Sequence, residues 1–155
     1  MPAGFWLALA AGLALRVWYF SDLIAQPWFG YPLVDALTFD RTALGILRDG
    51  YQGAFSRPPL YPHFLAAVYS LFGHSAAAVV WIQFALGLGA LAPAYRLGQR
   101  WFGQSAALAG VWVSAIYPLR IFFEAETLDV TLFTFLFLCA TWQLWQAIET
   151  NASSR

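Results

Sequence analysis

The segment PLYPHFLAAVYSLFG, residues 59–73, decides how many times this chain crosses a membrane. The segment is apolar but only 15 residues long, whereas a helix that spans the hydrocarbon core needs about 20 residues. We therefore expect an interfacial or partly inserted helix here. If the segment did span the membrane, Arg96 and Arg100 would face outward and the two acidic segments of the chain would lie on opposite sides.

Four longer apolar stretches surround this segment, and we expect them to span the membrane at residues 3–20, 75–95, 102–118 and 128–148. The 155-residue chain is 61% hydrophobic with a mean hydropathy of +0.61, which is more apolar surface than a soluble core of this size can bury. The sequence predicts an all-α integral membrane protein, a single membrane domain with about four transmembrane helices and extracytoplasmic juxtamembrane amphipathic helices. Its first outer loop covers residues 21–74 and its second covers 118–127. The net charge of zero argues against nucleic acid as a partner.

The charged residues predict an orientation. With four spans, Arg96, Arg100 and Arg155 share one face with the N-terminus, whereas Asp35 and Glu126 share the other. Short loops that carry arginine remain in the cytoplasm. We therefore expect a cytoplasmic N-terminus and an extracytoplasmic acidic face.

The stretch DALTFDRTALGILRD, residues 35–49, has the pattern of an amphipathic helix that lies on the membrane surface. Apolar residues fall on one half of its helical wheel, charged residues and threonines fall on the other, and Gly50 supplies a stop. Asp35 stands at its head, where a carboxylate caps the first amides. Asp35 is thus either an N-cap or a functional group.

The candidate catalytic or metal-binding residues are carboxylates from two distant segments. Asp35 and the acidic pair Glu124 and Glu126 are expected at one membrane face, where ionisable groups are costly and tend to be functional. Together they could bind a divalent cation such as Mg²⁺ or Mn²⁺, or one of them could deprotonate a hydroxyl acceptor. Arg57 and Arg120 could hold a phosphate at the bilayer surface, or could contact lipid headgroups instead.

Five short motifs occur in order: LALRVWYF, DALTFDRTALGILRDG, SRPPLYPHFL, YRLGQRWFG and AIYPLRIFFEAETL. Together they resemble the N-terminal portion of the GT-C glycosyltransferases, in particular the bacterial family-39/83-like group related to protein mannosyltransferases. The resemblance implies a cell-envelope enzyme of the bacterial inner membrane. Such enzymes transfer a sugar from a polyprenyl-phosphate donor to an acceptor at the extracytoplasmic face.

The resemblance also implies roles for individual residues. The catalytic acid at the head of the juxtamembrane helix falls on Asp35, as general base or with a metal, and the second acidic position falls on Glu126 rather than Glu124. Arg57 and His63 fall near the donor phosphate, although a histidine such as His63 is more often a packing residue. Some relatives have an Asp-Glu pair where this chain has Asp35-Ala36, which argues against metal dependence here.

Relatives of this kind are several times longer than this chain. We therefore expect an N-terminal fragment or minimal form that works with a missing C-terminal part or with a partner subunit. The alternative is a small non-catalytic four-span accessory or structural subunit whose acidic segments bind headgroups or a partner.

Overall fold

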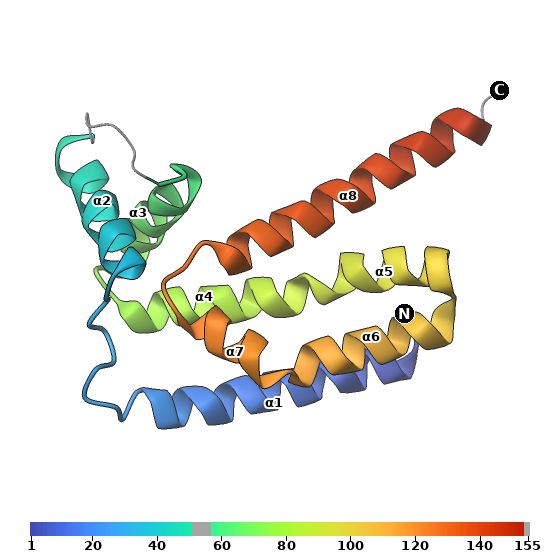
Figure 1. Cartoon of the computed structure of the whole chain (residues 1–155), viewed down its shortest axis with the longest axis horizontal. Coiled ribbons are helices and arrows are strands. Elements are labelled where there is room, and N and C mark those ends of the chain that lie inside the picture. The colour runs from blue at the N-terminus through green and yellow to red at the C-terminus, as the bar shows by residue number, and fades with distance from the viewer. Residues whose placement is uncertain (51–56, 154–155) are drawn as a thin grey trace.

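The computed structural model describes residues 1–50 and 57–153, and all of its regular structure there is helical (Figure 1). This confirms the predicted all-α class. The helices are α1 (Ala3–Leu23), α2 (Asp35–Asp49), α3 (Leu60–Phe72), α4 (Ala76–Gly89), α5 (Leu91–Phe102), α6 (Gln104–Ile116), α7 (Pro118–Ala125) and α8 (Val130–Ser153).

Within the described residues, three helices are long and apolar enough to cross a membrane: Ala3–Leu23, Ala76–Phe102, which joins α4 to α5, and Val130–Asn151. The pair α6 and α7 passes the same test together but is bent by 53°. Pro118 explains the bend, because proline disfavours the helical conformation in the residue before it, and Tyr117 is indeed extended with ψ 114°. Counting this bent pair as one span gives the predicted number of about four, and α3 is too short to add a fifth.

Four long helical segments alternate in direction: α1, α4 with α5, α6 with α7, and α8 (Figure 1). One end of the molecule holds α2, α3, the start of α4 and the turn between α7 and α8, and we call it the α2/α3 end. The opposite end holds the N-terminus, the α5–α6 turn and the end of α8, where Arg100 of α5 pairs with Glu149 of α8.

Two segments differ from the expected loops. Arg96 and Arg100 lie in the last turns of α5 rather than in a loop, because no proline lies between Tyr95 and Gly103, where the helix ends with a positive φ of 84°. Most of the second expected loop, 118–127, is the helix α7. Its Ile121 is buried against Val80 and Phe84 of α4, which gives this short amphipathic helix an apolar surface to pack on.

Helix α2 has the predicted bounds, and Gly50 ends it in the left-handed conformation with φ 69°. Its apolar half contacts α3. Phe39 and Ala43 are buried in a cluster with Tyr61 and Leu65 of α3. The two short helices therefore cover one another and form a compact cap at the α2/α3 end.

Candidate functional site

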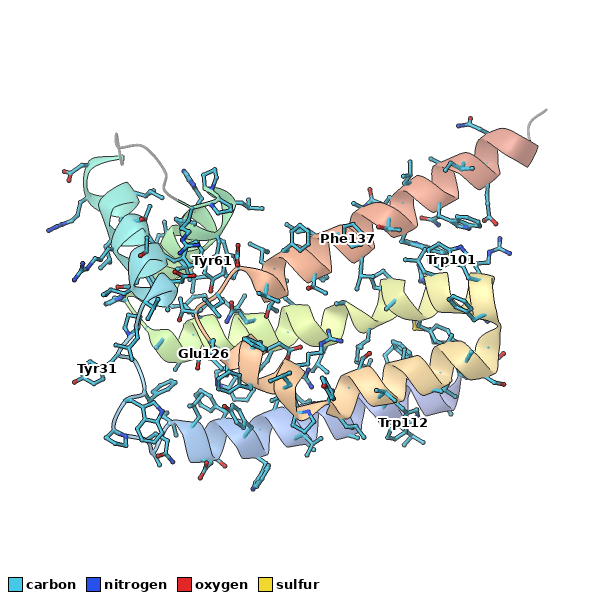
Figure 2. The ribbon with its side chains drawn as sticks, viewed as in Figure 1. Tyr31, Tyr61, Trp101, Trp112, Glu126 and Phe137 are labelled. Carbon is cyan, nitrogen blue, oxygen red and sulfur yellow. The ribbon has the colours of Figure 1, made fainter. Side chains whose placement is uncertain are left out.

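A cavity of about 330 Å³ opens at the α2/α3 end, between the 24–34 connection, α2, the start of α4 and the α7–α8 turn. Its polar lining comes from Asp40, Tyr69, His74, Glu126 and Thr127, and its aromatic lining includes Trp28, Phe29 and Tyr31. Figure 2 shows Tyr31 and Glu126 at this end of the molecule. The lining residues come from segments that are far apart in the sequence, so only the folded chain assembles the cavity.

Asp40 is the centre of a hydrogen-bonded triad in this cavity. It is only 6% exposed, and its Oδ1 accepts a hydrogen bond from the Tyr69 hydroxyl at 2.7 Å and lies 2.7 Å from His74 Nε2. Burial raises the pKa of Tyr69, and the hydrogen bond to Asp40 adds to this effect. The phenol therefore stays protonated and remains a donor. His74 is half exposed, so Asp40 orients an imidazole that a ligand can reach.

Glu126 lines the same cavity and is held there through its backbone. The buried side-chain amide of Gln83 donates hydrogen bonds to the carbonyl oxygens of Glu124 and Glu126, at 2.9 and 2.7 Å. The Tyr61 hydroxyl donates to the Gln83 amide oxygen at 2.8 Å. This chain of contacts fixes the turn after α7 against α3 and α4, and leaves the Glu126 carboxylate free to face the cavity. Partial burial raises the pKa of that carboxylate above its ordinary value.

Asp35 lies at the first position of α2 and pairs with Arg57 across the start of α3. The N-cap position belongs to Val34 and no side chain caps the helix, so the expected capping role of Asp35 is wrong. Val34 has a φ of 51°, a conformation that strains a β-branched residue. Both members of the ion pair are accessible, with 48% of Arg57 and 40% of Asp35 exposed. Asp35 is not among the residues lining the cavity, although its neighbour Ala36 is.

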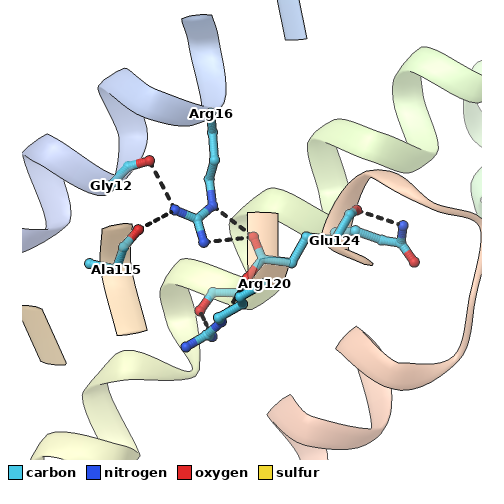
Figure 3. A network of polar contacts seen from close by, with 7 residues as sticks. Gly12, Arg16, Ala115, Arg120 and Glu124 are labelled. Carbon is cyan, nitrogen blue, oxygen red and sulfur yellow. Dashed lines mark hydrogen bonds and ion pairs between the residues drawn. The ribbon is translucent and has the colours of Figure 1, made fainter. Parts of the chain in front are cut away.

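Glu124 and Arg120 belong to a different cluster, inside the helix bundle (Figure 3). The fully buried Arg16 donates from Nε to Glu124 Oε2 at 2.7 Å, and from Nη1 to the carbonyl oxygens of Gly12 and Ala115 at 2.9 and 3.0 Å. Arg120 donates from Nε to Glu124 Oε1 at 2.9 Å and from Nη2 to the carbonyl oxygen of Gly87. We call these three charged side chains the buried network. It ties α1 to α4, α6 and α7.

The remaining expected site residues are not brought together. His63 is exposed on α3, with its Nδ1 2.7 Å from the Pro59 carbonyl oxygen of its own helical turn. In the part of the chain that the structure describes, no group of three or more His, Cys, Asp or Glu side chains could hold a metal ion. The donor set expected for Mg²⁺ or Mn²⁺, Asp35 with Glu126, is thus limited to two carboxylates, and one of them is paired with Arg57.

Several residues of these clusters were not predicted as site residues, among them Asp40, Tyr69, His74 and Gln83. Gln83 carries a signal, because it is the one polar side chain in the otherwise apolar stretch 76–91. Asp40 and His74 are 34 residues apart, and nothing in their local patterns indicates that they meet.

A profile of the dolichyl-phosphate-mannose-protein mannosyltransferases matches residues 56–155, which is more than half of the chain. The match includes Arg57, Tyr69, His74 and Glu126 and begins after Asp35. Searches of curated proteins and of solved structures returned no match. The family match confirms the resemblance to the GT-C glycosyltransferases and covers the last three of the five motifs. The chain belongs to the dolichyl-phosphate-mannose-protein mannosyltransferase family of GT-C-type membrane glycosyltransferases.

Proposed function

We propose that this protein transfers a sugar from a polyprenyl-phosphate donor to a hydroxyl acceptor at the α2/α3 end, with Asp35 as general base. The observation that carries the proposal is an accessible carboxylate–guanidinium pair, Asp35 with Arg57, beside a cavity lined by further carboxylates. An exposed ion pair contributes little stability. A donor phosphate can therefore replace Asp35 as the partner of Arg57 at low cost.

The chemistry follows from that exchange. Arg57 binds the donor phosphate by charge-assisted hydrogen bonds, and Asp35 is then free to accept the proton of the acceptor hydroxyl. The hydroxyl oxygen forms a bond to the anomeric carbon of the sugar. The bond from that carbon to the phosphate oxygen breaks, and its electron pair leaves with the polyprenyl phosphate.

The orientation proposed for this activity places the α2/α3 end outside the cytoplasm of a bacterial inner membrane. Arg96 and Arg100 lie in α5, the helix that ends at the opposite end beside the N-terminus, and the positive-inside rule assigns such an end to the cytoplasm. A membrane-impermeant maleimide tests this in intact cells, with Cys139→Ala as background. Asp49→Cys should be labelled and Gln99→Cys should be protected, and the reverse pattern would refute the orientation.

The activity is tested with the full-length protein in proteoliposomes and a radiolabelled polyprenyl-phosphate mannose donor. Asp35→Asn should lower transfer at least about 100-fold, the range for loss of a general base. Asp49→Asn, at the other end of the same helix, is the matched control and should transfer at the wild-type rate. Near wild-type transfer by Asp35→Asn would remove the general-base role. A wild-type protein that transfers no sugar would favour a non-catalytic accessory subunit.

A further inference from the structure

We propose that the cavity at the α2/α3 end is a subsite for an uncharged pyranose ring. The ring is bound through the Asp40–Tyr69–His74 triad and through an aromatic wall formed by Trp28 and Tyr31. This proposal rests on the proposed glycosyltransferase function and specifies which part of a substrate the cavity holds.

The charge of the lining selects the uncharged part of a substrate. Asp40 and Glu126 contribute two carboxylates, and no arginine is among the described residues that line the cavity. The whole chain contains no lysine. An anionic phosphate would be repelled by this lining. Arg57, which suits a phosphate, lies outside the lining, so the cavity and the phosphate position are separate.

The triad supplies directed hydrogen-bonding groups for ring hydroxyls. The contacts of Asp40 with Tyr69 and His74 both use Oδ1, and Oδ2 is the second acceptor of that carboxylate. His74 turns Nε2 towards Asp40, which makes Nδ1 its second hydrogen-bonding atom. With more than half of the His74 side chain exposed, the imidazole is within reach of a ligand. A carboxylate that orients a histidine, with a tyrosine fixing the carboxylate, is a preorganised arrangement.

The aromatic wall supplies the complementary apolar surface. Trp28 and Tyr31, on the connection between α1 and α2, are 61% and 74% exposed although they are large apolar groups. A pyranose has faces of C–H groups, which pack on aromatic rings, and a rim of hydroxyls, which require hydrogen-bond partners. The volume of about 330 Å³ lies at the lower end of the range for small-molecule sites, and therefore suits one ring rather than an oligosaccharide.

The binding test uses methyl α-D-mannopyranoside and the full-length protein in nanodiscs, with tryptophan fluorescence as the readout. We expect saturable quenching that the Trp28→Phe substitution removes and Trp101→Phe, at the opposite end, leaves intact. His74→Gln and Asp40→Asn should each weaken binding about tenfold, as for the loss of one hydrogen bond to an ionised or polarised partner. Gln99→Leu, at an exposed position of α5 at the opposite end, is the control and should bind as the wild type does.

Inorganic phosphate is the anion control and should neither quench the fluorescence nor compete with the sugar. Competition by phosphate, or wild-type affinity in both His74→Gln and Asp40→Asn, would overturn the proposal. If His74→Gln fails to fold, Glu126→Gln gives a second test, because its side chain lines the cavity and is outside the triad. It should also weaken binding.

Transfer kinetics show whether the ring that the cavity holds belongs to the donor or to the acceptor. If the cavity holds the sugar of the donor, His74→Gln raises the KM for the lipid-linked donor and leaves that for the acceptor unchanged. If the cavity holds a sugar of the acceptor, the pattern reverses. Sugar binding is measured without a donor, so its result is independent of transfer. Normal sugar binding without transfer would refute the proposed function alone. Normal transfer without sugar binding would refute the subsite alone.

Discussion

The buried network and the α2/α3 end use the same side-chain chemistry in opposite surroundings. In the network, Arg16 and Glu124 are 0% and 2% exposed. At the α2/α3 end, Arg57 and Asp35 are 48% and 40% exposed. Glu124 belongs to the buried network and Glu126 lines the cavity at the α2/α3 end, although they are two residues apart in the sequence. The first lies on α7 and points to Arg16, and the second follows α7 in an extended conformation.

The difference in burial between the two ion pairs indicates which of them can take part in chemistry. A buried pair has given up its hydration, so removing one partner leaves an uncompensated charge and costs several kcal/mol. An exposed pair exchanges partners with water or with a ligand at little cost. Arg16, Arg120 and Glu124 hold the helices together. The roles proposed for Asp35, Arg57 and the cavity residues fit the exposed end of the molecule.

The largest effect is expected from breaking the buried network with Glu124→Gln. The change keeps the shape of the side chain but leaves two guanidinium groups without their carboxylate. The variant should lose about 3–5 kcal/mol of stability, measured by thermal unfolding in nanodiscs. Glu149→Gln breaks the exposed pair with Arg100 and should cost less than about 1 kcal/mol. Equal melting temperatures for the two variants would contradict the contrast between buried and exposed pairs.

A comparable loss of stability is expected from Gln83→Leu, because Gln83 links the turn that carries Glu124 and Glu126 to Tyr61 of α3. Loss of the amide leaves the Tyr61 hydroxyl and two backbone carbonyls without their partner, and each unsatisfied buried group costs about 1–3 kcal/mol. The turn that carries Glu126 should also shift, so sugar binding should weaken along with stability. Gln99→Leu, at an exposed position of α5, should change neither property. Unchanged sugar binding in Gln83→Leu would show that this clamp does not position the cavity.

Gly87→Ala should strain the network without removing a charge. A methyl group at Gly87 would overlap the Glu124 carboxylate, and overpacking of this kind costs about 1–3 kcal/mol. At Gly110 a methyl group would meet nothing within 4 Å, so Gly110→Ala is the matched control. Thermal unfolding of both variants gives the comparison. A Gly87→Ala protein as stable as the control would mean that Glu124 can move away from its two arginines without loss.

The smallest effect is a change in the pH dependence of stability, which tests the burial of Glu126 in the cavity. Burial raises the pKa of Glu126 above its ordinary value of 4.5. The folded state therefore favours its protonated form, and this contribution to stability is present below about pH 4.5 and is lost as the pH rises through the folded pKa. Glu126→Gln stays neutral at every pH. Its stability relative to the wild type should thus increase as the pH rises from 4.5, and parallel stability curves would contradict the burial of Glu126.

Local patterns predicted α2 and the long apolar helices, but neither α7 nor the tertiary partners of the helices. The bounds of α2 follow from its amphipathic pattern and from Gly50, both of which act within a few residues. The role of Glu124 could not be predicted, because Arg16 is 108 residues away and a sequence pattern does not indicate which face of α7 turns inward. The same holds for Asp40 and His74, whose contact depends on how the α2–α3 pair docks on α4. Arg96 and Arg100 were expected in a loop because of their charge, although no proline lies between Tyr95 and Gly103 to end the helix there.

The most direct test of the division between structure and chemistry is to measure thermal stability and sugar transfer together in Asp35→Asn and Glu124→Gln. Asp35→Asn should melt within a few degrees of the wild type and lose at least about 100-fold in transfer. Glu124→Gln should melt far below the wild type, and its transfer should fall in proportion to the folded fraction. The division would be contradicted if Asp35→Asn transferred sugar at the wild-type rate, or if Glu124→Gln remained fully folded and lost only transfer.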